Sequence, residues 1–267
     1  MSAAYAVLIL PFAWLLGCTE PNAVRPPPPG PVPATTVTIA NPMAFLVSGD
    51  TRHDWPLPAG YVELTSERVS ATLARQHWDF APFGTYEPER GDGFQIAEIG
   101  ADGWVRFMST LDGGTPWVQY FVGQRCGGTG WLVFGLDAPT GSWREAVARL
   151  NIAQDPETCP PSLNDALTRY RLEPVAFPFA VAGQTSTRTI ATVISEHYDQ
   201  RTIGKAGALE RSYLGQGYGL LRWEAWGRTP PSIPALAERC GPLAYSDPPT
   251  AGWHLRDCRT YTNVVTE

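Results

Sequence analysis

Four charged residues with aromatic neighbours in the last third of the chain are the side chains best suited to chemistry. The segment 187–226 predicts three antiparallel β-strands joined by two glycine-containing turns, because β-branched and aromatic residues fill the runs between them. If Ile194 pairs with Tyr213 and Tyr213 pairs with Arg222, the alternation of side chains puts one set of residues on a single face. That set is Glu196, Tyr198, Arg211, Tyr213, Arg222, Glu224 and Trp226.

This face fits a shallow ligand-binding platform. Aromatic rings would stack on sugar faces, while Arg and Glu would bind hydroxyl or acidic groups. The same residues also fit a solvated face with weak ion pairs, each worth at most about 1 kcal/mol. Both interpretations require the predicted register, since a one-residue slip would move all side chains of a strand to the other face.

A polysaccharide lyase is one catalytic alternative for the same segment. Such an enzyme needs a base close to an arginine that neutralises the substrate carboxylate. His197, Tyr213 and Arg222 are the candidate catalytic residues. The register directs His197 to the opposite face from the other two, which counts against this trio.

A glycosidase is the second catalytic alternative. It needs two carboxyl groups about 5 to 9.5 Å apart, and three glutamates of the segment, Glu196, Glu210 and Glu224, offer such a pair. Adjacent strands bring glutamates this close in many sheets, so the spacing alone does not favour catalysis.

The chain shows no pattern typical of a metal or cofactor site. The histidines stand at positions 53, 77, 197 and 254, and no two have the i, i+2 or i, i+4 spacing of metal ligands. The glycine-rich stretches 127–130 and 215–219 predict turns, because they do not open helices with Lys and Ser or Thr behind them. We therefore expect no metal and no cofactor.

Four of the five cysteines lie in the body of the chain, an even set that an oxidising compartment would pair. Three pairings are possible. We prefer Cys126 with Cys159 and Cys240 with Cys258, because closing the shorter loops costs less entropy. Zinc is the weaker interpretation, since none of the four has Cys-x-x-Cys spacing.

The fifth cysteine, Cys18, follows an apolar run over residues 3–17. The run is shorter than the roughly 20 residues that cross a bilayer and contains a proline, which favours a secretory signal over a spanning helix. Residues 15–18, Leu-Leu-Gly-Cys, resemble the lipobox of bacterial lipoproteins. The resemblance implies that residues 1–17 are a signal peptide and that Cys18 is lipidated and becomes the mature N-terminus.

A proline-rich linker over residues 18–34 separates this segment from the body of the chain. Its prolines favour an extended polyproline conformation, which makes a semi-rigid spacer. Such a spacer would hold a folded body away from the membrane.

The body predicts a mainly β fold, an antiparallel β-sandwich of jelly-roll type. Six runs rich in β-branched and aromatic residues predict strands, at 35–40, 94–109, 117–122, 130–136, 187–199 and 219–226, and Asp102-Gly103 predicts a hairpin turn inside the second run. Capping and spacing predict short helices at 142–151 and 162–171. Pro174 and Pro178 mark a boundary between a first β part, 35–178, and a second, 179–267, which we expect to pack against the first.

The net charge and the predicted export of the chain limit the classes of partner. The formal net charge of −6 argues against binding to nucleic acid. We expect an exported, lipid-anchored protein of a bacterial envelope, with the membrane as partner through its anchor, that binds a glycan or another envelope component without catalysis. A carbohydrate-active enzyme and a structural or assembly subunit of the envelope are the alternatives.

Overall fold

The computed structural model describes residues 35–54, 62–79, 92–111, 117–241, 243 and 245–265 of the 267-residue chain. The chain from Pro33 to Glu267 forms one compact unit. The predicted signal peptide, Cys18 and the linker lie outside the described residues. Within the described ranges, no helix has the length and apolar character needed to cross a membrane.

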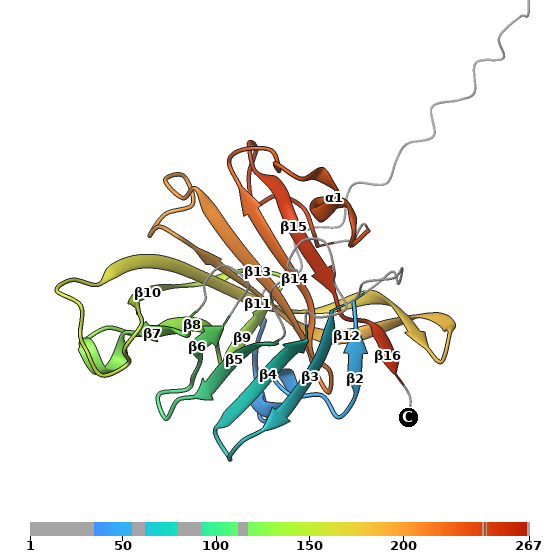
Figure 1. The fold of residues 1–267 in the computed structure, drawn as a ribbon, viewed down its shortest axis with the longest axis horizontal. Coiled ribbons are helices and arrows are strands. Elements are labelled where there is room, and N and C mark those ends of the chain that lie inside the picture. Colours follow the sequence, from blue (N-terminus) through green and yellow to red (C-terminus); the bar gives the residue numbers. More distant parts are fainter. Residues whose placement is uncertain are drawn as a thin grey trace, which may run out of the picture. The chain divides into compact units, whose positions relative to one another are not determined.

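Nearly all regular secondary structure of the described residues is β-strand (Figure 1). The first eight are β1 (Thr35–Thr38), β2 (Thr51–His53), β3 (Glu63–Arg68), β4 (Leu73–Asp79), β5 (Asp92–Ile99), β6 (Trp104–Leu111), β7 (Gln119–Val122) and β8 (Trp131–Gly135). The others are β9 (Asp137–Thr140), β10 (Arg144–Ala153), β11 (Asn164–Val181), β12 (Gln184–Tyr198), β13 (Ala208–Gly215), β14 (Gly219–Gly227), β15 (His254–Thr260) and β16 (Asn263–Val265). Short helical turns are η1 (Pro42–Phe45), η3 (Gln124–Cys126) and α1 (Pro234–Glu238). The predicted mainly β class is confirmed, and a β-sandwich is compatible with these sheets.

The long strand β11 joins two groups of strands (Figure 1). Along one edge it pairs with β12, which continues through β13 and β14 to β15. Along the other edge its beginning pairs with β10 and its end pairs with β16. From β10 the hydrogen-bonded order runs through β7, β6, β5, β4, β3 and β2 to β16, so this group starts and ends on β11.

The main hydrophobic core lies where these two groups face each other. We call strands β2–β8, β10 and β16 the first group and strands β12–β15 the second group. Buried residues of the first group, such as Val105 and Phe134, belong to the same cluster as Val193 of β12 and Leu214 of β13. The cluster buries large aliphatic and aromatic side chains, which supply most of the driving force for folding. The packing therefore fixes the inner face of β12–β15 against β4–β8.

The two predicted helices are wrong: both segments are strands, β10 and the first part of β11. Along β10, Ala146, Ala148 and Leu150 point inward while Glu145 and Arg149 are exposed, an alternation of period two. The capping-box spacing favoured a helix locally, but pairing of β10 with both β7 and β11 overrides that preference.

The predicted boundary at residues 178 and 179 falls inside β11 and does not separate two bodies. Between 171 and 179 this strand pairs only with β12, and both Pro174 and Pro178 are exposed. Proline is tolerated where its missing N–H faces an unpaired edge. The chain reverses instead at Ala182 and Gly183, both with positive φ, which joins β11 to β12 in a tight hairpin.

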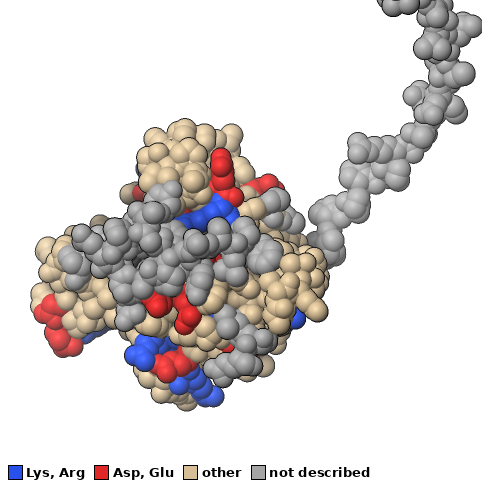
Figure 2. Space-filling model, turned by 45° about the vertical axis from the view of Figure 1, so that its right-hand side comes forward, with Lys and Arg blue, Asp and Glu red and all other residues tan. Residues whose placement is uncertain are grey.

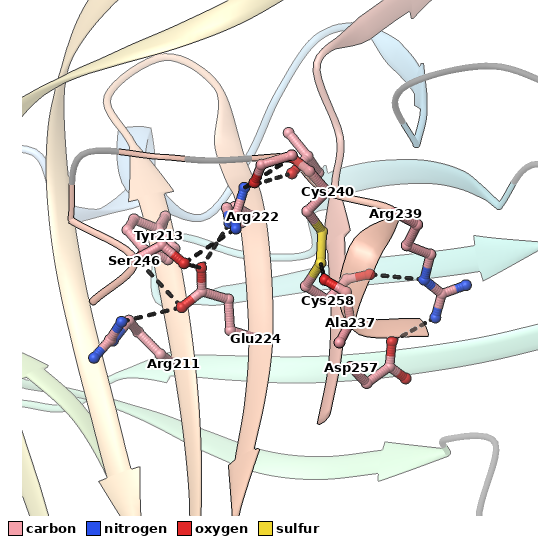
Figure 3. Close-up of a disulfide and its surroundings, with 12 residues drawn as sticks. Arg211, Tyr213, Arg222, Glu224, Ala237, Arg239, Cys240, Ser246, Asp257 and Cys258 are labelled. Carbon is pink, nitrogen blue, oxygen red and sulfur yellow. Dashed lines mark hydrogen bonds and ion pairs between the residues drawn. A yellow bond between two sulfur atoms is a disulfide. The ribbon is translucent and has the colours of Figure 1, made fainter. Parts of the chain in front are cut away.

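Both predicted disulfides are present, Cys126–Cys159 and Cys240–Cys258. The second bond ties the segment after α1 to strand β15 (Figure 3). Two disulfides in one body indicate an oxidising, exported environment.

Candidate functional site

The predicted register of β12, β13 and β14 is confirmed residue by residue. Ile194 lies opposite Tyr213, and Glu196 lies opposite Arg211. Arg211 in turn lies opposite Glu224 on β14. The seven candidate binding residues therefore share one face of the sheet, as the alternation of side chains required.

Glu196 receives charged donors from both neighbouring strands. Its Oε1 lies 2.8 Å from Arg211 Nε, and its Oε2 accepts hydrogen bonds from Arg169 Nε and from the Tyr198 hydroxyl, the latter at 2.5 Å. Burial by itself would raise the pKa of this carboxyl, but Arg211 and Arg169 lower the pKa below its usual value. The carboxylate is therefore held ionised.

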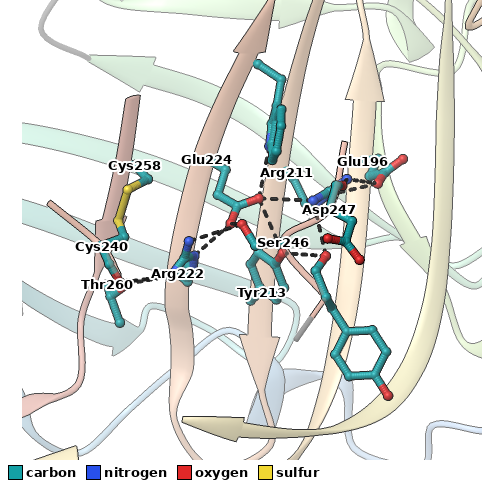
Figure 4. A network of polar contacts seen from close by, with 12 residues as sticks. Glu196, Arg211, Tyr213, Arg222, Glu224, Cys240, Ser246, Asp247, Cys258 and Thr260 are labelled. Carbon is teal, nitrogen blue, oxygen red and sulfur yellow. Dashed lines mark hydrogen bonds and ion pairs between the residues drawn. A yellow bond between two sulfur atoms is a disulfide. The ribbon is translucent and has the colours of Figure 1, made fainter. Parts of the chain in front are cut away.

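Glu224 is the second centre of this network (Figure 4). Its Oε2 accepts from Arg211 Nη1 at 3.1 Å and from Trp226 Nε1 at 3.0 Å. Its Oε1 accepts from Arg222 Nε at 2.7 Å and from the Ser246 hydroxyl. We call Glu196, Arg211, Arg222 and Glu224 the ionic network.

The segment that begins at Cys240 and precedes β15 covers the ionic network (Figures 3 and 4). We call it the covering segment. Arg222 Nη1 donates to the backbone oxygens of Cys240 and Gly241, both at 3.1 Å. Arg211 donates to the backbone oxygens of Tyr245 at 3.2 Å and Asp247 at 3.0 Å. Every one of these contacts uses a donor that a ligand would otherwise need.

The prediction of a solvent-facing platform is therefore wrong. Glu196 and Glu224 have 0% exposed surface and Arg211 and Arg222 have 2%, while Tyr198, Tyr213 and Trp226 are also buried. Paired charges with additional hydrogen bonds can be buried without leaving an isolated ion in the interior. The seven residues do lie together on one face, but they contact one another and the covering segment, not solvent.

The proposed catalytic trio does not converge. Tyr213 and Arg222 lie in the buried network, whereas His197 lies on the opposite face of β12. For the glycosidase alternative, Glu210 pairs with His197 across the strands and so lies on the other face from Glu196 and Glu224.

A cavity of about 680 Å³ lies on that opposite face, between β4–β7 and β12–β15. The residues that line it from the first group of strands are Trp78, Gln95, Phe107, Thr110, Gln119 and Phe121. Those that line it from the second group are His197, Glu210, Ser212, Trp223, Asp257 and Arg259. Leu150 and Ile152 of β10 and Trp131 of β8 complete the apolar part of the wall. Side chains on this face of β12–β14 thus line a large cavity that is open to solvent at Glu210 and Ile152.

Aromatic rings form one end of this cavity. The Trp131 ring stacks on His197 with centroids 4.0 Å apart and lies 4.4 Å from the ring of Phe121. The ring centroid of Phe107 lies 6.3 Å from that of Trp131. Rings arranged this way offer flat apolar surface to a ligand.

His197 is a neutral hydrogen-bonding group in this aromatic end. The Thr168 hydroxyl donates to Leu132 O at 2.9 Å and lies 3.2 Å from His197 Nδ1. Because the hydroxyl proton is used on Leu132, Nδ1 carries the imidazole proton and Nε2 is the acceptor. Burial lowers the pKa of His197 to about 3, so the ring stays uncharged near neutral pH.

The sequence did not predict the cavity, because its most prominent pattern, the alternating opposite charges of the ionic network, belongs to the other face of the sheet. The same alternation did assign Ser195 and His197 to a second face. What the sequence lacked was pairing information for β4, β6, β7 and β8, whose tryptophan and phenylalanine residues meet that face. Aromatic residues in strands look alike whether they fill a core or line a cavity.

The described residues contain no group of three or more His, Cys, Asp or Glu side chains placed to hold a metal ion. On the face drawn in Figure 2, the described acidic and basic residues form small mixed groups separated by uncharged surface. Comparison of the chain with protein-family models, curated proteins and solved structures gave no match.

Proposed function

We propose that this chain is an exported, lipid-anchored envelope protein that holds one small ligand in the cavity without catalysing a reaction. The observation that carries the proposal is the cavity itself. Its volume of about 680 Å³ lies within the range of small-molecule sites, about 300 to 1,000 Å³. Its lining combines aromatic and aliphatic residues with a nearly equal number of polar and charged residues, so both apolar and hydrogen-bonding groups face a ligand.

Binding without chemistry is favoured by the state of the candidate catalytic groups. A general base needs a pKa near the working pH, but burial holds His197 neutral with a pKa of about 3. Tyr213 lies in the covered ionic network, where burial raises the pKa of its hydroxyl above the usual value. An enzyme would need a different base, for which the carboxyl groups lining the cavity are Asp199, Glu210 and Asp257.

Export and anchoring are supported by different observations. The two disulfides favour an oxidising compartment. The lipobox-like residues 15–18 support attachment through Cys18, with the proline-rich linker as spacer. A Cys18→Ser variant tests the anchor, because loss of membrane partitioning and of acyl mass is expected.

Native mass spectrometry of the protein isolated from its own envelope tests the binding proposal. We expect a ligand that leaves when the protein unfolds. Calorimetric titration with that ligand should show affinity reduced by about tenfold or more in Trp131→Ala, because the ring offers apolar contact area. Trp143→Ala is the matched control, since Trp143 lies outside the cavity and packs on Arg169 and Arg171.

Three results would overturn the proposal. A protein that carries no ligand and binds none from an envelope extract would not be a binding protein. Equal affinity of Trp131→Ala and Trp143→Ala would move the site away from the cavity. Conversion of the ligand during the titration would favour the carbohydrate-active enzyme instead.

A further inference from the structure

A row of uncharged polar side chains crosses one wall of the cavity. Gln76 pairs with Gln95, Gln95 with Thr110 and Thr110 with Gln119, across the four strands β4 to β7. Directly paired residues share a face of the sheet, so the four side chains point the same way. Gln95, Thr110 and Gln119 line the cavity. We call these four residues the amide row.

Gln76 has an unused hydrogen-bonding group at the end of this row. The residue is only 3% exposed, and neither its amide oxygen nor its amide nitrogen has a hydrogen-bond partner among the described residues. Leaving such an amide unpaired costs about 1 to 3 kcal/mol. Gln76 is not itself one of the lining residues, so a ligand meets the row at Gln95, Thr110 and Gln119, and the Thr110 hydroxyl already donates to Phe94 O at 3.0 Å.

Charged side chains of the opposite wall already interact within the protein. Asp257 Oδ1 accepts a hydrogen bond from Arg239 Nη2 at 2.5 Å. Arg259 interacts electrostatically with the Asp54 carboxyl. The carboxylate of Glu210 on the same wall disfavours an anion. An anionic head group entering the cavity would lose its hydration without gaining an uncommitted counter-charge.

Resting on the proposed function, we infer that the ligand is an uncharged amphiphile. Its apolar body lies against Trp131, Phe107 and Phe121, and its hydroxyl- or amide-bearing head is bound by the amide row. Glutamine amides both donate and accept, which matches a head group that also does both. A glycosyl head group has this chemistry, whereas a carboxylate offers acceptors only.

Calorimetric titration with three amphiphilic probes, each below its micellar concentration, tests the head-group specificity. Octyl glucoside and octyl phosphate differ only in the polar end, and the chain of octanoate is shorter by one methylene, worth about 0.8 kcal/mol. We expect the glucoside to bind the full exported protein at least tenfold more tightly than either anion. Equal or tighter binding of octyl phosphate or octanoate would overturn the inference and leave the proposed function intact.

The failure of the two proposals can be told apart. If the isolated protein carries a ligand but none of the three octyl probes binds, an uncharged amphiphile is wrong while the cavity remains a binding site. If the protein neither carries a ligand nor binds a probe, the proposed function fails as well.

Variants of the amide row test which residues form hydrogen bonds with the head group. In Gln95→Met with Gln119→Met, side-chain length is retained while both amides are removed. We expect the glucoside-to-octanoate affinity ratio to fall about tenfold, with octanoate affinity itself unchanged. Gln184→Met, at the exposed start of β12, should keep the ratio. An unchanged ratio in the double variant would show that the amide row does not bind the head group.

Discussion

The two faces of the sheet β12–β14 differ in what their polar residues do, although the residues alternate along the same strands. On one face, Glu196, Arg211 and Glu224 satisfy one another and are covered. On the other face, His197 and Ser212 line the cavity. The stronger electrostatic pattern thus marks the structural face, and the weaker polar pattern marks the face with room for a ligand.

The difference has a physical origin in partner availability. The carbonyl oxygens of the segment after Cys240 accept the remaining donors of Arg211 and Arg222, which allows a charged surface to be buried. The cavity face meets aromatic rings, which pack against one another and leave space that no side chain of the lining fills.

The largest effect is expected from removing one charge of the ionic network. Glu224→Gln should lower the free energy of unfolding by about 3 to 5 kcal/mol, because Arg222 loses its ion-pair partner while remaining buried. Glu210→Gln on the cavity face is the matched control and should change stability by less than about 0.5 kcal/mol, since this residue is exposed. Urea unfolding of both variants measures the difference.

A double variant sharpens the same comparison. Arg222→Met combined with Glu224→Gln should cost less than the sum of the two single changes, because no unpaired charge is left. Additive costs would contradict the account of the network as mutually dependent charges.

Removing the disulfide beside the network should have the next largest effect. The bond Cys240–Cys258 closes a sequence separation of 18 residues, for which loop entropy gives a stabilisation of about 3 kcal/mol. In Cys240→Ser with Cys258→Ser we also expect faster amide hydrogen exchange at Arg222 and Glu224, since the disulfide ties the covering segment to β15. The exchange at β6 and β8 on the cavity side should stay unchanged; equal acceleration there would contradict a local role.

A smaller, pH-dependent effect is expected on the cavity face. The pKa of His197 is about 3 in the folded protein, against an ordinary value of 6.5, so below pH 6.5 the unfolded chain binds a proton that the folded chain does not. The free energy of unfolding therefore falls as the pH drops from 6.5 towards 3, at up to about 1.4 kcal/mol per pH unit. Above pH 6.5, His197 is neutral in both states and causes no such loss.

The window between pH 6.5 and 4.5 isolates His197 from the ionic network. The lowered pKa of Glu196 removes stability only below its ordinary value of 4.5, as the carboxylate becomes protonated. We expect wild-type protein to lose about 2 kcal/mol more than His197→Gln across this window in urea unfolding. His254→Gln, at the exposed start of β15, should behave like wild type. Parallel curves for wild type and His197→Gln would show that His197 titrates normally.

Local pairing was predictable where the sequence itself supplies the turn. The hairpin at Asp102 and Gly103 and the register of β12–β14 follow from alternation and from glycines that accept positive φ. The disulfide pairs follow from short loop lengths. These features depend on residues close together in the chain.

Features that depend on distant segments were not predictable in the same way. The helix predicted at 142–151 is strand β10 because its partners, β7 and β11, are supplied by other parts of the chain. The burial of Glu196 likewise depends on a segment about fifty residues later in the sequence. Local preference is weak compared with the free energy of pairing and packing.

The sequence by itself determined which side chains share a face, because the period of a β-strand is two residues and its turns set the register. Only the tertiary structure decided that the charged face is covered and that the opposite face lines a cavity. Burial depends on what packs against a face, and that partner is chosen by long-range contacts which no local pattern encodes.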